Sequence, residues 1–312
     1  MTSSKRVAPP LPQVDRDGLA PSELANDFDG LFERDATVGE IREFFRQSLT
    51  KDHDIVRLGG CTVIGLPLTW DTDLLGFECY RILSVSGGDS VHDVDAAVSA
   101  VFRQRRVDLA CCRTVSGGRL DHELSSLPAW VPVSRKILFR KPLEKQSRNN
   151  HLEGWLSLER VDGQERERLL PEMWEMWRAN MPESRFTSDD RLGVETARRI
   201  YREWIMNSVS KSETRIWVVK QPSGPLGGFV IARHLETPAG VRAASIDLIA
   251  ARSGSRLGDP ILSMAERALE SESVEVLYAA TEERNEHGRE LFARAGFDEF
   301  NSCREFHCWF LS

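Results

Sequence analysis

The residues best suited to chemistry lie in one stretch near the end of the chain, residues 243–297. The apolar segment 243–251 predicts a strand and is followed by the polar turn Arg252–Gly258, which also contains Gly254. Pro260 then falls in the first turn of a helical pattern, where a missing N–H is tolerated. Residues 274–280 predict the next strand. A glycine-containing turn that leads from a strand into a helix exposes backbone N–H groups. The stretch therefore predicts a site for an anionic ligand.

Two side chains close to this stretch could move a proton. Asp247 lies between the apolar residues Ile246 and Leu248 in a predicted strand, so alternation is expected to turn it away from them. There it could act as a general base, or it could be a strand-edge residue bonded to a turn. His234, at the end of the preceding predicted strand, is the second candidate because imidazole titrates near neutral pH.

The rest of the sequence predicts the elements that position these residues. Residues 154–312 show the order strand, two helices, three strands, helix, strand, helix and strand. Residues 29–143 predict a smaller α/β unit that begins with a helix at 35–49 and continues with strands at 54–66 and 76–85 and a helix at 91–105. Residues 144–153 are polar and unpatterned and predict a linker, and residues 1–28 predict a mobile tail. We therefore expect an α/β protein of two domains.

Composition excludes several classes of protein. The chain has 312 residues and a net charge of −7, which does not favour a protein that coats nucleic acid. Its apolar runs have the length of strands, and prolines follow Lys5 and Arg6. Neither a membrane span nor a secretory signal is expected. The six cysteines lack zinc-site spacing and any regular framework, so we expect no metal and the reduced thiols of a cytoplasmic protein.

The second half of the sequence resembles the GCN5-related N-acetyltransferases, or GNATs. The resemblance rests on the order of the predicted elements, on the turn after the fourth strand, and on a last helix containing Asn285, Leu291-Phe292 and Gly296-Phe297. It implies a mixed, mostly antiparallel sheet flanked by helices. It also implies that the fourth strand separates from the fifth and that acyl-CoA lies in the opening.

The first half resembles one branch of this superfamily. Trp70-Asp71-Thr72 followed by Gly76-Phe77 is similar to a segment of the TDP-fucosamine acetyltransferase-like proteins, and Ser184-Arg185-Phe186 is similar to their second-helix region. In that branch an incomplete GNAT-like domain precedes a complete one. The resemblance therefore implies a partial GNAT-like domain at 29–143 and an acyltransferase domain at 154–312.

The resemblance implies an N-acyltransferase that moves an acyl group from acetyl-CoA or another acyl-CoA to a primary amine. Attack would be direct, within a ternary complex. An amino sugar or a natural-product intermediate is the implied acceptor, in secondary metabolism. The implied donor site consists of Leu248, Ile249, Arg252, Ser253, Gly254, Arg256, Gly258, Asn285 and Phe292.

Three residues of the two long helical segments and the loop between them are candidates for binding the acceptor. Arg185 could hold a carboxylate or phosphate, or form a surface ion pair. Tyr201 and Trp204 could form part of an aromatic acceptor site, or belong to the core between the helices.

Two residues depart from the GNAT pattern. Arg256 stands where the turn usually has glycine, so its side chain either crowds the pyrophosphate or pairs with a phosphate. Phe292 stands where the superfamily commonly has tyrosine, whose hydroxyl protonates the leaving thiolate, and phenylalanine cannot do this. The thiolate is itself a good leaving group, so a slower enzyme or another proton donor is expected.

These departures leave two alternatives open. The donor could be an aminoacyl-tRNA, which needs no CoA pyrophosphate loop, with basic residues at 135, 136, 140, 141, 145 and 148 to hold its phosphates. The second alternative is a GNAT-fold protein that binds ligands or partners but no longer catalyses a reaction. The sequence defines neither the acceptor nor the oligomeric state.

Overall fold

The computed structural model describes residues 53–310 except 59, 89, 144–156, 163, 212–213, 221–225, 236 and 238–239. The predicted tail at 1–28, helix at 35–49 and linker at 144–153 lie outside these residues. Contacts divide the chain into two compact units. Unit 1 comprises Met1–Val133 and Cys303–Ser312, and unit 2 comprises Ser134–Ser302.

The units differ in extent from the expected domains. The divisions fall inside two strands, β5 (Trp130–Pro142) and β11 (Asp298–Trp309), so the end of the chain belongs to unit 1. From Cys303 to Trp309, β11 pairs antiparallel with β4 (Leu109–Val115). This pairing joins residues far apart in the sequence, which a local pattern cannot reveal.

In its described residues, unit 1 is a sheet in the order β1-β2-β3-β4-β11 with the helices α2, α3 and α4. Its other elements are β1 (Asp54–Leu58), β2 (Cys61–Pro67), α2 (Thr69–Leu75), β3 (Cys79–Gly87), α3 (Val91–Arg105) and α4 (Arg119–Ser126). The helix predicted for 91–105 is confirmed, and its apolar face is buried. The single strand expected at 54–66 is instead a hairpin, and the short helices α2 and α4 were not predicted.

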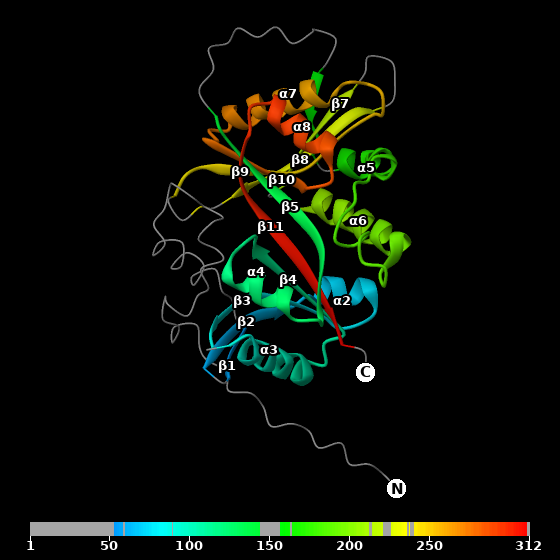
Figure 1. Cartoon of the computed structure of the whole chain (residues 1–312). Coiled ribbons are helices and arrows are strands. Elements are labelled where there is room, and N and C mark those ends of the chain that lie inside the picture. The colour runs from blue at the N-terminus through cyan, green and yellow to red at the C-terminus, as the bar shows by residue number, and fades with distance from the viewer. Residues whose placement is uncertain are drawn as a thin grey trace. The chain divides into compact units, whose positions relative to one another are not determined.

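Unit 2 confirms the predicted order of elements (Figure 1). Its elements before β11 are β6 (Ser157–Arg160), α5 (Gln164–Ala179), α6 (Gly193–Ser210), β7 (Thr214–Lys220), β8 (Leu226–Leu235), β9 (Ala243–Ala251), α7 (Gly258–Ser271), β10 (Val276–Glu282) and α8 (Glu286–Arg294). The sheet order is β5-β10-β9-β8-β7-β6. No helix in the described part of the chain is long and apolar enough to cross a membrane.

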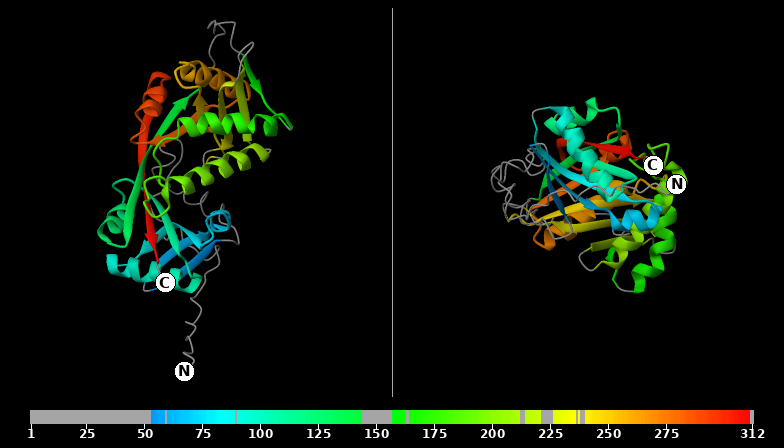
Figure 2. Two further views of the ribbon diagram at one scale, coloured as in Figure 1. Left: turned by 90° about the vertical axis from the view of Figure 1, so that its right-hand side faces the viewer. Right: turned by 90° about the horizontal axis from the view of Figure 1, so that it is seen from below.

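The unit 2 sheet is covered on both faces. Helices α5 and α6 lie side by side over one face, as the left view of Figure 2 shows, and pack on Phe229, Ile231 and Leu248. Helix α7, together with Phe292 of α8, covers the other face and packs on residues such as Ala232. Each face thus has its own apolar core, which fixes the sheet between two helical layers.

A β-bulge interrupts β9 at Asp247. Ile231 of β8 pairs with Leu248, whereas the next residue, Ala232, pairs with Ile246, so Asp247 is left without a partner in the ladder. As a result Ile246 joins the core under α7, and Leu248 joins the core under α5 and α6. The alternation predicted through Asp247 is therefore wrong, because a bulge inserts one residue and inverts the facing pattern.

The parallel ladder between β9 and β10 stops at the same point. It runs from Ala243 paired with Val276 to Ile246 paired with Ala279. Strand β9 continues to Ala251 and β10 continues to Glu282 without further pairing between them. One edge of β9 is therefore open beyond Ile246, as the GNAT resemblance implies.

Unit 1 repeats this framework, although the sequence shows no repeat. Strand β3 has a register shift against β2 that leaves Leu83 unpaired, in the position that Asp247 occupies in β9. The parallel ladder of β3 with β4 likewise ends after four pairs, at Ile82 and Cys112. Both units therefore contain a bulged strand that parts from its parallel neighbour and leads into a helix.

Gly228 makes the closest approach between β8 and α7. A Cβ atom there would lie 2.2 Å from Ile261 Cδ1 and 2.8 Å from the Ala250 carbonyl oxygen. We predict that Gly228→Ala lowers the free energy of unfolding by about 1–3 kcal/mol, because overpacking displaces the helix. In Gly258→Ala, the control, the Cβ would meet Leu291 at an ordinary 3.5 Å. Urea unfolding measures both; equal stabilities would contradict the tight packing.

Candidate functional site

The turn between β9 and α7 presents backbone donors. Gly254 and Arg256 both have positive φ angles, 75° and 55°. Within the turn, Ser255 N–H donates to the Arg252 carbonyl, 3.0 Å, and Leu257 N–H donates to Ser255 Oγ, 3.3 Å. The remaining turn N–H groups have no acceptor among the described residues: Ser253, Gly254, Arg256 and Gly258. Such a set can bind an anion.

In the corresponding turn of unit 1, at residues 88–90, two backbone N–H groups donate to other groups of the protein. Ser90 and Asp93 form a capping box at the start of α3, so the carboxylate of Asp93 already accepts the Ser90 N–H at 2.9 Å. Gly88 N–H donates to the Gly60 carbonyl, 3.2 Å. Two described N–H groups of the unit 1 turn thus have protein acceptors, whereas four in the unit 2 turn have none among the described residues.

Two arginines of the unit 2 turn have different roles. Arg252 donates through Nε and Nη2 to the Leu226 carbonyl, at 3.3 and 3.1 Å, and lies 3.9 Å from the carboxylate of Glu172 on α5. It therefore ties the end of β9 to β8. Arg256 is exposed and makes no hydrogen bond or ion pair with the described residues, so its guanidinium is available to a ligand.

Asp247 is held by an arginine of the neighbouring strand. Arg233 Nε and Nη2 donate to its two carboxylate oxygens at 3.0 and 3.3 Å. The Asp247 side chain is 16% exposed and that of Arg233 45%. Because both oxygens already accept a charged donor, proton transfer to Asp247 must compete with a bidentate ion pair.

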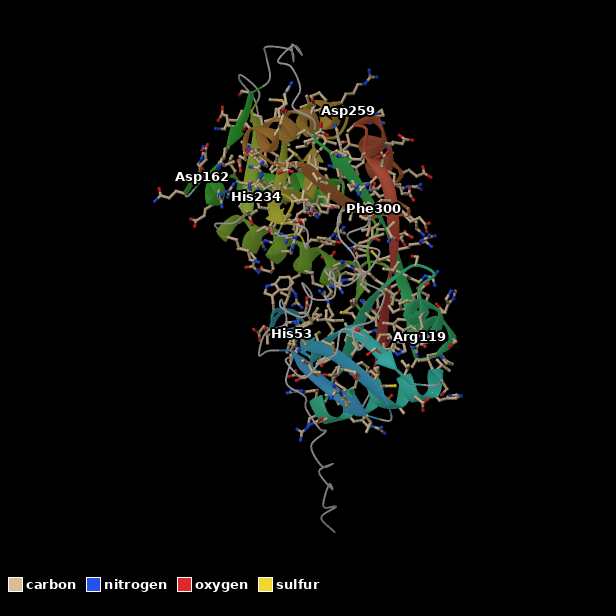
Figure 3. The ribbon with its side chains drawn as sticks, turned by 90° about the vertical axis from the view of Figure 1, so that its left-hand side faces the viewer. His53, Arg119, Asp162, His234, Asp259 and Phe300 are labelled. Carbon is tan, nitrogen blue, oxygen red and sulfur yellow. The ribbon has the colours of Figure 1, made fainter. Side chains whose placement is uncertain are left out.

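His234 lies on the opposite face of the sheet from Asp247. Its Nε2 is 2.9 Å from Glu272, which follows α7, and Arg215 Nε donates to the same carboxylate at 3.2 Å. The neighbouring residue Arg233 pairs with Asp247 on the other face, as strand alternation requires. Figure 3 shows His234 on β8. The structure does not bring the two proton-transfer candidates together.

Asn285 and Phe292 have structural partners. Asn285 caps α8: its Oδ1 accepts the Gly288 N–H at 3.1 Å, and its Nδ2 donates to Thr281 Oγ1 at 2.8 Å. Phe292 is buried, with its ring 5.3 Å from those of Phe139 and Phe297. Both residues fix the position of α8 beside β10.

This geometry has counterparts among solved structures. The sequence matches no protein-family model and no curated protein. By structure, the chain is similar to a GCN5-related N-acetyltransferase from Sphaerobacter thermophilus, with a TM-score of 0.59, 12% identity and coverage of 93% of this chain and 94% of that one. The chain has the GNAT fold.

Two further structures support this assignment. A tandem GNAT protein from the clavulanic acid biosynthesis pathway matches with a TM-score of 0.52 at 15% identity, covering 88% of each chain. A GCN5-related N-acetyltransferase from Kribbella flavida matches with a TM-score of 0.52 at 10% identity, covering 84% of this chain and 91% of that one. The predicted fold class is confirmed, and the match to a tandem protein agrees with the framework shared by units 1 and 2.

The acceptor candidates form an aromatic group on the α5 and α6 side of the GNAT sheet. Arg185 lies over the Phe186 ring, 4.3 Å from its centroid, and Phe186 packs edge-on against Tyr201. Tyr201 in turn contacts Trp177, 5.7 Å between centroids. Trp204 packs partly buried against the same core. Tyr201 and Trp204 therefore both contribute to the packing of the helices.

Sequence reasoning missed one carboxylate beside the open edge. Glu282 is the last residue of β10 and is buried. The predicted strand ends at Ala280, whereas the observed strand continues to Glu282. The pairing of β10 with β5 continues to Glu282 and Lys136, and this pairing cannot be read from the sequence of β10 alone.

The described residues contain no group of three or more His, Cys, Asp or Glu side chains that could hold a metal ion. All six cysteines are buried free thiols.

Glu272 allows a test through pH. Burial alone would raise the pKa of Glu272, but hydrogen bonds from His234 and Arg215 outweigh it and lower the pKa below its ordinary value of 4.5. A lowered pKa contributes stability above the unfolded-state value and loses it as pH falls through the folded-state value. We predict that Glu272→Gln is less stable than wild type at pH 7 and that the difference disappears on acidification below pH 4.5. Urea unfolding at several pH values measures this, and a difference that grows toward acid would contradict it.

Proposed function

We propose that the protein is an N-acyltransferase that moves an acyl group from acyl-CoA to a primary amine of a small molecule. One observation carries the proposal: the β9–β10 ladder ends at Ile246 and Ala279, just before a turn with open N–H groups. The open edge of β9 offers a channel for the acyl chain, and the turn offers donors for the pyrophosphate. The GNAT fold supports acyl transfer in general.

Catalysis in this proposal depends on position more than on covalent chemistry. The thioester lies along the open edge of β9, near Leu248 and Ile249, where backbone N–H groups can polarise its carbonyl. The amine attacks the carbonyl carbon directly within the ternary complex. Holding both substrates in place supplies a large part of the rate enhancement.

The proposed donor residues divide into two kinds. Gly254, Ser253 and Gly258 supply backbone N–H groups. Arg252 and Asn285 already have protein partners and therefore position the turn and α8. Phe292 has no hydroxyl to protonate the departing thiolate and lies in the core, so the thiolate leaves unprotonated or takes its proton from elsewhere.

The acceptor in this proposal is an amino sugar or a natural-product intermediate, with a cytoplasmic role in secondary metabolism. The resemblance to the TDP-fucosamine acetyltransferase-like branch supports the former. The structural likeness to a protein of the clavulanic acid pathway is consistent with the latter. Arg185, Tyr201 and Trp204 are the proposed acceptor contacts.

A second candidate is an aminoacyl-tRNA donor, which Arg256 and Phe292 motivate. Its proposed phosphate stripe is weakened by ion pairs. Arg135 binds Glu283 at 2.9 Å, and Lys141 donates to Glu266 at 2.7 Å and to the Ala295 carbonyl at 2.6 Å. Positions 145 and 148 lie outside the described residues. These engaged cations favour acyl-CoA as the donor.

Calorimetric titration with acetyl-CoA tests the donor. We expect about one molecule bound per chain with a Kd below about 1 mM, that is, more than about 4 kcal/mol of binding free energy. The expected stoichiometry follows from the unit 1 turn, where protein groups already accept the N–H groups of Gly88 and Ser90. Acetyl-pantetheine, which lacks the pyrophosphate, should bind at least about tenfold more weakly.

Absence of acetyl-CoA binding at millimolar concentration would contradict the proposal. If the protein instead retards aminoacyl-tRNA in a gel, and added salt weakens that complex, the donor is the tRNA. If neither donor binds, a non-catalytic GNAT-fold protein is the remaining reading.

Arg256 gives a sharper test of the turn. We predict that Arg256→Ala weakens acetyl-CoA binding by about ten- to a hundredfold, the size of one lost charge-assisted hydrogen bond of about 1.5–3 kcal/mol. Binding of acetyl-pantetheine should not change. Arg256→Gly should lose the same affinity while unfolding at equal or higher denaturant, because glycine relieves the positive φ angle. Tighter acetyl-CoA binding by Arg256→Gly would mean that the side chain crowds the phosphates.

A further inference from the structure

A short segment between α5 and α6 contacts both sides of the opening between β9 and β10. We call this segment, Asn180–Ser188, the strap. At its first residue, Asn180 Nδ2 donates to the Ala251 carbonyl at the end of β9, a long hydrogen bond of 3.5 Å. Farther along, the Glu183 carboxylate accepts Arg284 Nη1 at 2.7 Å, just beyond the end of β10. The strap therefore reaches from one parted strand to the other.

The direction of the two strands places these contacts at the mouth of the opening. Strands β9 and β10 are parallel, and their ladder stops at Ile246 and Ala279, so the carboxyl end of each strand lies beyond the last pair. Ala251 is the last residue of β9, and the turn proposed for the pyrophosphate follows directly. A segment that contacts both carboxyl ends thus crosses the mouth of the opening, next to that turn.

Hydrogen bonds within the strap give it a defined turn. Ser184 N–H donates to Thr187 Oγ1 at 2.7 Å, and Ser188 N–H donates to the Ser184 carbonyl at 2.8 Å. Ser188 Oγ also donates, at 3.0 Å, to the same Glu183 oxygen that accepts Arg284. The turn therefore orients the Glu183 carboxylate, which reduces the side-chain entropy lost when the ion pair forms.

The pair of Glu183 and Arg284 can form and break in solvent. On the β10 side its position is fixed, because the neighbouring Glu283 N–H donates to the Arg135 carbonyl of β5 at 2.7 Å. The hydrogen bond from Arg284 lowers the pKa of Glu183, so the pair is charged at neutral pH. The Arg284 side chain is 77% exposed and that of Glu183 42%, so water and salt reach both. Such a contact closes the strap without locking it.

We propose that the strap, closed by the Glu183–Arg284 ion pair, retains acyl-CoA in the opening between β9 and β10; this rests on the proposed acyltransferase function. With the ion pair formed, the thioester lies beneath the strap and water has less access to it. When the ion pair breaks, acyl-CoA enters and CoA leaves along the edge of β9. The rate of donor exchange then depends on the ion pair, whereas the contacts that hold the pyrophosphate stay in the turn.

Stopped-flow dissociation of acetyl-CoA tests the ion pair. We expect Arg284→Gln and Glu183→Gln each to release acetyl-CoA about two- to fivefold faster than wild type, the effect of one exposed ion pair. The double variant Glu183→Arg/Arg284→Glu, which exchanges the charges, should release it more slowly than either single variant. High salt should abolish the difference between wild type and Arg284→Gln. The matched control is Glu175→Gln, which removes an exposed ion pair with Arg178 within α5, 2.6 Å, and should change nothing.

A covalent link gives a larger effect. A short bismaleimide joins the two introduced thiols of Glu183→Cys/Arg284→Cys, since all six native cysteines are buried. Cross-linked with acetyl-CoA bound, the protein should keep the ligand through gel filtration. Cross-linked without it, the protein should bind acetyl-CoA at least about tenfold more slowly than the same variant before cross-linking.

The outcomes separate the strap from the proposed function. Equal release rates in wild type and both single variants, with unhindered exchange in the cross-linked protein, would overturn the role of the strap. Binding of acetyl-CoA, and with it the acyltransferase proposal, would stand. Wild-type protein that does not bind acetyl-CoA at all would overturn both.

Discussion

The end of pairing between β9 and β10 is the constraint on which the site depends. Strand β9 keeps its antiparallel ladder with β8 up to Ala251, so it remains fixed while its other edge opens beyond Ile246. Backbone N–H and C=O groups along an open edge need partners. A ligand that runs along this edge supplies them, and the following turn continues the row of open donors. The bulge at Asp247 lies where the opening begins, as bulges near active sites often do.

The framework itself does not decide which opening binds a ligand. Units 1 and 2 share the bulged strand, the short parallel ladder and the helix that follows. They differ in the turn. In unit 1 Asp93 and Gly60 accept the N–H groups that a ligand would need, and Arg119 donates to the carbonyls of Gly87 and Gly88. The same backbone framework thus carries two turns whose N–H groups have different partners, and function follows from local groups and not from the fold.

Local sequence patterns predicted helices and strands well where the apolar residues follow a single helical or strand spacing. The strand at 243–251 and the helix at 91–105 have the predicted bounds, because apolar periodicity and flanking turn residues agree there. The short helices α2 and α4 escaped prediction because two turns carry too little periodicity. The bulge at Asp247 escaped for another reason: it is defined by the register of β8, and no local signal in β9 marks it.

The sequence predicted which residues lie near the site but not what each of them does there. The role of a side chain depends on its hydrogen-bond partners, which only the fold determines. Asn285 and Arg252 lie where the pattern placed them, yet their donors and acceptors are taken by Thr281, Gly288 and Leu226. Glu282 shows the converse: it follows the predicted end of its strand, yet it is a buried strand residue opposite Lys136.

Arg256 combines backbone strain with an available charge. A non-glycine residue in the left-handed region costs about 1–2 kcal/mol. Arg106 and Ser273 also have positive φ angles, but each lies at the end of a helix, where that conformation commonly terminates the hydrogen-bond ladder. Arg256 instead precedes helix α7, and within the described residues no bond to its guanidinium offsets the cost. Strain of this kind persists where the surrounding structure imposes it, often at ligand sites. An ion pair between the Arg256 guanidinium and a ligand phosphate would offset the free-energy cost of this backbone conformation.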